Sequence, residues 1–204
     1  MRHAEKPDLR PFSGPGVLTR WLALTAVLLA GGCAVGPQQV AIDPDVRLAS
    51  RDLGQGRGIG IEVADLRPRR EIGVRDPADA TATISPAGEI EQALREILSR
   101  ALAGYGFVPR QAASGLRFRL ELTELSYIPL EGAVTKKVQV TAAVRGIAST
   151  AAGSYTATAR AGFTRELLTR PSEADNEGMI NEALGSALRR LLEDEGMLEF
   201  LARP

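Results

Sequence analysis

LRFRLEL, residues 116–122, decides the fold class, because apolar and charged side chains alternate along its length. A period of two is typical of a β-strand with one buried face and one wet face. The same alternation returns at residues 134–145 and again at 154–164. The two links, at 129–132 and 148–153, are short enough for antiparallel neighbours. We therefore predict three consecutive antiparallel strands whose apolar faces are covered by other elements.

One more strand and two helices are expected around these strands. Residues 59–64 alternate in the same way, and Pro68, which cannot donate to a strand ladder, follows them. Ser85 and Pro86 are suited to the N-cap and the first position of a helix, and a second helix follows Pro171. Both helices carry a continuous apolar stripe. The predicted fold class is α+β: a two-layer sandwich with a mainly antiparallel four-stranded sheet and two helices on one face, in the order β-α-β-β-β-α.

A short apolar segment, from Trp21 to Cys33, precedes this domain. It is too short to cross a bilayer, which takes about 20 residues, but it has the length of a signal-peptide core. Its end resembles a bacterial lipobox, formed by Ala30, Gly31, Gly32 and Cys33. We predict that residues 1–32 are a signal peptide that is removed and that Cys33 is lipidated, palmitate included. The alternative is a buried helix with a free cysteine, which two consecutive glycines disfavour.

The residue after Cys33 bears on the location of the protein. It is Ala34, whereas an aspartate there tends to keep a lipoprotein in the inner membrane of Gram-negative bacteria. We therefore expect a lipid anchor at the periplasmic face of the outer membrane. Residues 33–57, rich in glycine and proline, are predicted to form a flexible tether that reaches about 25–30 Å. Residues 58–204 are the predicted single α+β domain. Translation starts at Met1 or, from a GTG codon, at Val17.

The composition excludes several classes of function. The whole chain carries 25 basic and 25 acidic residues, and removal of the leader leaves 21 against 23, so we expect no nucleic-acid partner. The only histidine, His3, lies in the leader, and the only cysteine is the predicted lipid site. A Ser-His-Asp triad, a Cys-His pair and a His/Cys zinc site are therefore excluded in the mature domain. We expect no cofactor, no metal and no enzymatic activity.

Only chemistry based on carboxylates remains, as in glycosidases. The nominal candidates are Asp65, Asp76, Glu121 and Glu131. The loop after the 59–64 strand holds Asp65, Arg67 and Arg75, which we treat as possible binding residues. Two interpretations are open: a small polar site at the end of a strand, or a set in which Asp65 accepts hydrogen bonds and fixes its own loop. We favour the second interpretation.

Two adjoining segments, Val63–Pro68 and Ile72–Arg75, form a pattern: a strand that ends in Asp-x-Arg, then Ile-Gly and a basic residue. Ser85-Pro86, residues 104–108 and the terminal helix accompany it. Together these features resemble the YajG-like bacterial lipoproteins, a family of uncharacterised envelope proteins, over residues 57–202. The resemblance implies a lipid-anchored periplasmic domain, and it supplies no catalytic residues because the family has no established activity.

The leading functional hypothesis is a non-enzymatic lipoprotein, held in the membrane through Cys33, that binds or supports an envelope protein partner. One alternative is an auxiliary subunit of an envelope transport system. Another is a small-ligand-binding, glycan-binding or hydrolytic domain that uses the Asp65–Asp76 loop.

Overall fold

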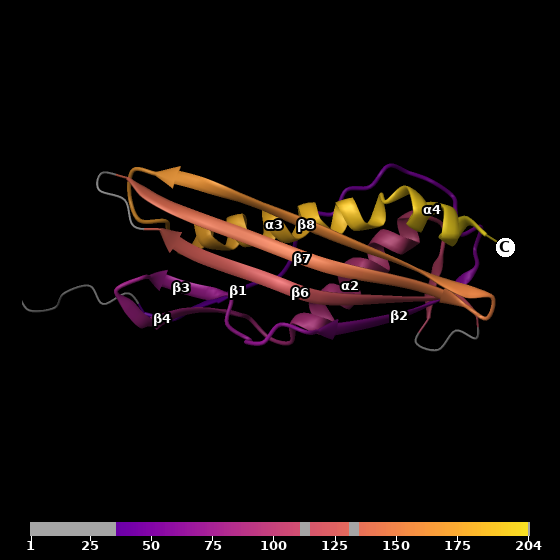
Figure 1. The fold of residues 1–204 in the computed structure, drawn as a ribbon, viewed down its shortest axis with the longest axis horizontal. Coiled ribbons are helices and arrows are strands. Elements are labelled where there is room, and N and C mark those ends of the chain that lie inside the picture. The colour runs from indigo at the N-terminus through magenta and orange to yellow at the C-terminus, as the bar shows by residue number, and fades with distance from the viewer. Residues whose placement is uncertain (1–35, 111–114, 131–134, 204) are drawn as a thin grey trace, which may run out of the picture. The chain divides into compact units, whose positions relative to one another are not determined.

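The fold is built on three long strands that run back and forth. The computed structural model describes residues 36–110, 115–130 and 135–203. Among them, β6 (Arg117–Leu130), β7 (Lys136–Thr150) and β8 (Gly153–Leu167) pair antiparallel in succession. They form the broad part of the sheet in Figure 1. The prediction of three consecutive antiparallel strands is confirmed.

Shorter strands extend the sheet along the other edge of β6. There β2 (Gly58–Asp65) pairs parallel with the first half of β6, and β5 (Val108–Arg110) pairs parallel with β2. Further along, β3 (Gly73–Asp76) pairs parallel with β6 and antiparallel with β4 (Asp79–Pro86). Finally, β1 (Gln38–Val40) pairs parallel with β4. The described residues thus form one mixed sheet of eight strands.

This architecture contradicts the predicted fold class. We predicted a four-stranded, mainly antiparallel sheet with two helices, and the described part of the chain has eight mixed strands and three helices. The helices are α2 (Ile90–Gly104), α3 (Glu173–Leu192) and α4 (Glu195–Ala202). The loop expected after β2 contains β3 and β4. These strands were missed because they are short, and because β4 alternates alanine and threonine in place of large apolar residues.

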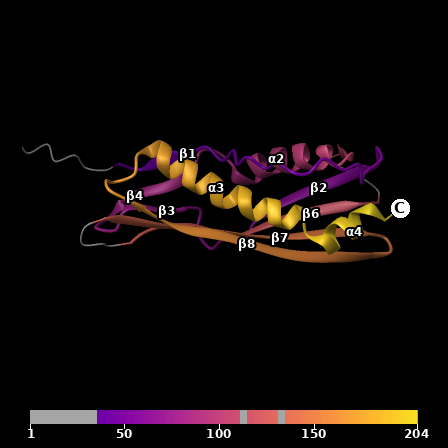
Figure 2. The ribbon, with the colours of Figure 1, turned by 90° about the horizontal axis from the view of Figure 1, so that it is seen from above.

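Both long helices lie on the same side of the sheet, as Figures 1 and 2 show. Helix α2 packs against β2 and β5, and α3 packs against β7 and β8. A capping box starts α3, because Ser172 and Asp175 each accept a hydrogen bond from the backbone of the other. One continuous core lies between the layers. Its fully buried side chains include Leu94 and Leu98 of α2, Phe118, Leu120 and Leu122 of β6, and Ile180 and Leu184 of α3.

The segment that leads into the domain is packed, although we expected residues 33–57 to be a flexible tether. Val40 and Ile42 are buried in the core. The backbone N–H groups of Ala41 and Asp43 donate to Glu177 and Asn181 of α3. The sequence did not indicate the packing of this segment on α3. Its apolar alternation is short and lies among prolines and glycines, and its partners on α3 are more than 130 residues away.

A buried chain of polar side chains joins β1, β6 and α3. The Tyr127 hydroxyl donates to Asn176 Oδ1 over 2.6 Å, and Asn176 Nδ2 donates to Gln38 Oε1 over 2.8 Å. Gln38 Nε2 in turn donates to the carbonyl of Glu173 over 2.8 Å. Burial raises the pKa of Tyr127 to about 12, so its phenol stays protonated and remains a donor. This series of hydrogen bonds holds Gln38 of β1 against α3, and it gives the buried polar groups of Gln38, Asn176 and Tyr127 partners.

Candidate functional site

Asp65 and Arg67, two of the three possible binding residues, form an ion pair with each other at the end of β2. Arg67 Nε donates to Asp65 Oδ1 over 2.9 Å, and Arg67 Nη2 donates to Oδ2 over 2.8 Å. The backbone N–H of Arg67 also donates to Oδ1. The side chain of Asp65 is only 11% exposed and that of Arg67 only 3%. This geometry supports the interpretation that Asp65 fixes its own loop, because both carboxylate oxygens are already occupied.

Arg75, the third residue, lies in different surroundings. Its Nη1 donates to the carbonyl of Gly36 over 3.1 Å and to Glu173 Oε1 over 2.8 Å. Within the described residues, no hydrogen bond or ion pair joins Arg75 to Asp65 or Arg67. The structure therefore does not bring the three residues together as one site. Arg75 connects β3 to the start of the described chain and to the start of α3.

A cavity of about 480 Å³ opens beside Arg75, and we call it the Arg75 cavity. Strands β3, β6 and β7 and the loop before α3 supply its walls, which include Tyr127, Pro129, Leu130, Lys136, Lys137 and Arg170. Several of its charges are already paired: Arg170 Nη2 lies 2.5 Å from Asp76 Oδ2, and Lys137 Nζ lies 3.6 Å from Glu166 Oε2. Its volume is in the range of small-molecule sites. Its lining is mainly basic, and ion pairs with Asp76 and Glu166 offset part of that charge.

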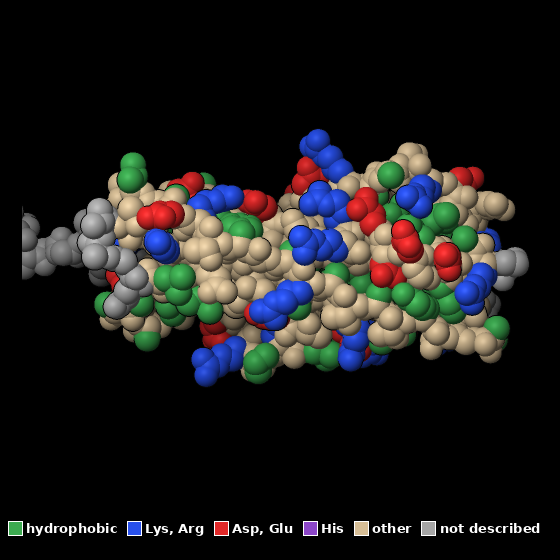
Figure 3. Space-filling view, turned by 45° about the horizontal axis from the view of Figure 1, so that its top comes forward, with side chains coloured by type: hydrophobic (Ala, Val, Ile, Leu, Met, Phe, Trp, Pro, Cys, Tyr) green, Lys and Arg blue, Asp and Glu red, His purple; other side chains and the backbone are tan. Residues whose placement is uncertain are grey.

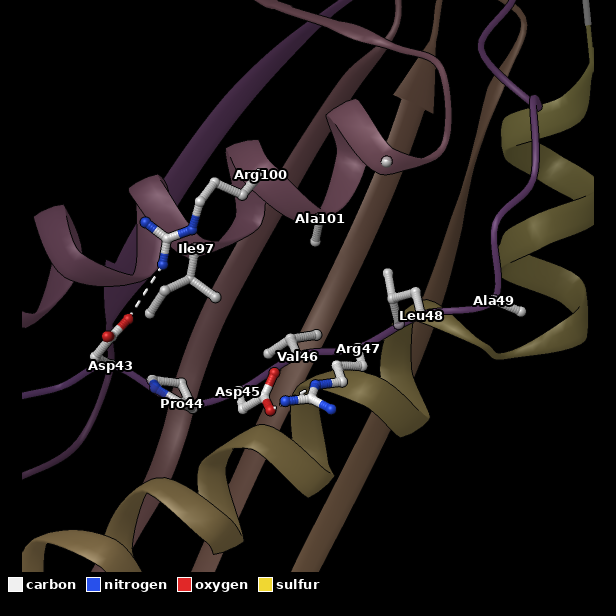
Figure 4. Close-up of a pocket in the computed structure, with 11 residues that line it drawn as sticks. Asp43, Pro44, Asp45, Val46, Arg47, Leu48, Ala49, Ile97, Arg100 and Ala101 are labelled. Carbon is white, nitrogen blue, oxygen red and sulfur yellow. Dashed lines mark hydrogen bonds and ion pairs between the residues drawn. The ribbon is translucent and has the colours of Figure 1, made fainter.

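A second cavity, of about 420 Å³, lies between residues 43–49 and α2 (Figure 4). Arg100 of α2 reaches across to Asp43, with Nη2 3.2 Å from Oδ1. Apolar side chains of Val46, Leu48 and Ile97 line the same space. No pattern in the sequence indicates this cavity, because its two walls, residues 43–49 and 97–104, are about 50 residues apart.

Glu121, one of the nominal catalytic carboxylates, is held by two arginines on the sheet face opposite the core residues of β6. Arg119 Nε donates to Glu121 Oε1 over 2.9 Å, and Arg145 Nε donates to Oε2 over 2.6 Å. Burial by itself raises the pKa of Glu121, but the hydrogen bonds from Arg145 and Arg119 outweigh it and hold the pKa below its usual value. Glu121 is therefore ionised at neutral pH, which makes it a poor general acid.

We expect Glu121→Gln to lower the free energy of unfolding by about 1–3 kcal/mol at neutral pH, since two arginines then lose a charged acceptor. The lowered pKa means that the native protein has this stability above the unfolded-state pKa of Glu and loses it as the pH falls through the folded-state pKa. The variant should therefore lose less stability than the native protein below about pH 4.5. Urea unfolding at neutral and acidic pH measures both effects.

Glu124→Gln is the matched control for this experiment. Glu124 lies on β6, like Glu121, and pairs with Arg160 of β8. Its side chain is more exposed than that of Glu121, so the variant should cost under about 1 kcal/mol. If both variants lost the same free energy of unfolding, the two hydrogen bonds from Arg119 and Arg145 to Glu121 would not contribute more than an exposed ion pair.

The remaining candidates form no catalytic set. Asp76 accepts from the backbone of Ala78 and pairs with Arg170. Among residues 36–110, 115–130 and 135–203, no group of three or more His, Cys, Asp or Glu side chains is placed to hold a metal ion. The lipobox residues Ala30, Gly31 and Gly32, the lipidation candidate Cys33 and the carboxylate Glu131 lie outside the described residues.

The described surface is of mixed charge. Figure 3 shows acidic and basic side chains interspersed on the face that it displays. In the described part of the chain, no helix has the length and apolar character needed to span a bilayer. Fold and site together define a class: an α/β domain that has a mixed sheet with its long helices on one side. In this domain the described candidate carboxylates, Asp65, Asp76 and Glu121, all form ion pairs with arginines.

The family follows from comparison with known proteins. A family model described as uncharacterized lipoprotein matches residues 44–202. The chain therefore belongs to this lipoprotein family, which confirms the resemblance to the YajG-like lipoproteins. No curated protein matches the chain.

Three solved structures are among those similar to this chain. A protein from Xanthomonas campestris is 13% identical, with a TM-score of 0.47, and the match covers 81% of this chain and 95% of the other. A putative neuraminyllactose-binding hemagglutinin homolog from Helicobacter pylori is 11% identical, with a TM-score of 0.44 and coverage of 81% and 97%. A minor lipoprotein from Acinetobacter baumannii is 11% identical, with a TM-score of 0.37 and coverage of 72% and 90%.

Proposed function

We propose that this protein is a non-enzymatic lipoprotein, anchored through an acylated Cys33 at the periplasmic face of the outer membrane, where its domain binds or supports an envelope partner. Family membership and the lipobox at residues 30–33 support the anchor. The observation that carries the proposal is a contact made by the chain just after the lipobox. Gly36, only three residues after Cys33, already bonds to Arg75 of the sheet.

The candidate carboxylates argue against a hydrolytic role. Both oxygens of Asp65 are occupied by Arg67, and both oxygens of Glu121 are occupied by arginines. A carboxylate in such a pair is a weak nucleophile or base, because the arginine stabilises its ionised form. Service as an auxiliary subunit of a transport system is one form of the proposed binding role, and crosslinking in intact cells would identify the partner.

We expect Cys33→Ser to abolish lipid attachment and to leave the protein soluble in the periplasm or retained as a precursor. Each buried methylene of an acyl chain contributes about 0.8 kcal/mol, so loss of the chains removes the whole anchor. Mass spectrometry of the N-terminal peptide should show acyl groups on the native protein and none on the variant. Detergent phase partition should move the processed variant to the aqueous phase, and its mass distinguishes it from a precursor that keeps residues 1–32. A variant that stays in the membrane with lipid attached would contradict the proposed anchor.

Ala34→Asp is both a control for Cys33→Ser and a test of the location. We expect this variant to keep its acyl groups and its membrane attachment, because Cys33 is intact. Its sedimentation in a membrane density gradient should shift from the outer to the inner membrane fraction. If the native protein already sediments with the inner membrane, the proposed outer-membrane location is wrong.

A further inference from the structure

One end of the sheet collects several chain segments, and we call it the Gly36 end. It comprises Gly36, the β3–β4 turn 76–79, the ends of β6 and β8 and the start of β7, and the loop 168–171. Leu130 pairs with Lys137, and Lys136 pairs with Leu167. The Arg170–Asp76 ion pair ties the loop to the turn. Segments far apart in the sequence therefore form one continuous surface, where the arrowheads of β3, β6 and β8 lie in Figure 1.

The Gly36 end exposes apolar side chains. Leu168 is 90% exposed, the highest value among the large hydrophobic residues of the described chain. Leu130 and Ile128, at the end of β6, are also exposed. A single exposed leucine is ordinary, but exposed apolar side chains near the ends of β6 and β8, on either side of β7, form a surface that water solvates poorly.

The direction of the chain brings this end toward the anchor. Because β1 runs parallel to β4, with Gln38 opposite Ile84, the chain before Gln38 points back toward the turn at Asp79. Gly36 is then about 10 Å short of that turn, at 3.3 Å per residue. Three residues from Gly36 to Cys33 span at most about 10 Å. An acylated Cys33 therefore holds the Gly36 end within reach of the bilayer surface.

The opposite end of the sheet cannot meet the bilayer at the same time. The β7–β8 turn at residues 150–153 is separated from the Gly36 end by strands of 15 residues. At about 3.3 Å per residue, that length is roughly 50 Å. A short link to the lipid therefore selects which end of the domain faces the membrane.

The charges at the Gly36 end are compatible with a phospholipid surface. Lys136, Lys137 and Arg170 have long side chains that can lie along apolar surface while their charged heads reach phosphate groups. Asp76 and Glu166 are paired with Arg170 and Lys137, and hydrogen bonds from Thr81 hold the pKa of Asp79, in the same turn, below its usual value. Basic and acidic groups at the Gly36 end are therefore balanced, and the apolar side chains carry the contact.

We infer that the Gly36 end is a membrane-contact surface. Leu168 and Leu130 enter the headgroup layer of the leaflet that holds the acyl chains, and the three basic side chains meet phosphate groups. The inference rests on the proposed anchor at Cys33. The partner of this surface is a phospholipid bilayer. Only three residues separate Gly36 from the acylated Cys33, so the bilayer that holds the acyl chains lies next to the Gly36 end.

The test uses the full, acylated protein reconstituted in vesicles of phosphatidylethanolamine and phosphatidylglycerol. Cys33 is blocked by its thioether, so an introduced cysteine can be labelled alone with an environment-sensitive fluorophore. Thr169→Cys reports the Gly36 end, and Ala152→Cys, in the exposed β7–β8 turn, is the matched control. A doxyl-labelled lipid should quench the label at 169 severalfold more than the label at 152, and aqueous iodide should show the reverse order.

Leu168→Asp, combined with Thr169→Cys, tests the apolar contact directly. We expect the aspartate to cut lipid quenching at 169 severalfold, whereas Leu66→Asp, at another exposed leucine, should leave it unchanged. In acylated protein, equal lipid quenching at 169 and 152 would overturn the contact surface and leave the anchor standing. Absence of acyl groups on Cys33, measured by mass spectrometry, would overturn the anchor and the contact surface together.

Discussion

Gly73→Ala is expected to lower the free energy of unfolding by about 3 kcal/mol, which is at the upper end for an overpacked site. Gly73 is the residue of β3 that pairs with Tyr127 of β6. A methyl group at Gly73 would overlap the carbonyl oxygen of Tyr127, which is backbone and cannot rotate away. The Tyr127 N–H already donates to the Ile72 carbonyl over 2.8 Å, so relief of the overlap requires separation of the two strands.

Gly178→Ala is the matched control for Gly73→Ala. Gly178 lies on the exposed side of α3, and an added methyl group there meets no atom within 4 Å. Alanine is the better helix former by about 1 kcal/mol, so this variant should be more stable than the native protein. Urea unfolding of the three proteins measures the difference. A Gly73→Ala protein as stable as the native one would refute the close approach of β3 to β6.

The second large effect is expected from Asp65→Asn, which should cost about 3 kcal/mol. The guanidinium of Arg67 is almost fully buried, and the substitution removes the charge that compensates it. A double variant, Asp65→Leu with Arg67→Met, should recover most of the loss, because it removes both charges. Denaturant unfolding of the single and double variants measures the coupling between the two residues.

Asp45→Asn is the exposed counterpart of Asp65→Asn. Asp45 also pairs with an arginine two residues further on, Arg47, but both side chains are largely exposed. We expect a loss of under about 1 kcal/mol. If Asp65→Asn left stability intact and impaired only the function of the protein in cells, the loop-fixing interpretation would be wrong and Asp65 would be a binding residue.

The elements that the sequence predicted are long and periodic, and those it missed are short. Strands β6, β7 and β8 repeat their alternation over 14 or 15 residues, and the apolar stripes of α2 and α3 are equally regular. By contrast, β1 and β5 have three residues each and β3 has four. These short strands form only by pairing with segments that are distant in the sequence. The parallel pairing of β2 with β6 likewise cannot be read from the residue pattern of either strand.

The same contrast applies to the candidate site. The Asp65–Arg67 pair could be foreseen, because two residues that are two positions apart at the end of a strand can meet without help from the rest of the fold. The partners of Arg75 could not, since Glu173 is 98 residues away and meets it only when α3 docks beside β3. For Glu121, Arg119 shares its face by strand alternation, whereas Arg145 meets it only through the register of β6 and β7.

The short strand β1 gives the domain a mechanical property. Its parallel pairing with β4 means that tension on the chain ahead of Gly36 pulls along the strand axis. The backbone hydrogen bonds between β1 and β4 are then loaded in shear together, instead of opening one after another. The side-chain bonds of Gln38 to Glu173 and Asn176 carry part of the same force into α3. Pulling from this end therefore loads the sheet and the helix layer together, and the domain should resist extraction as one unit.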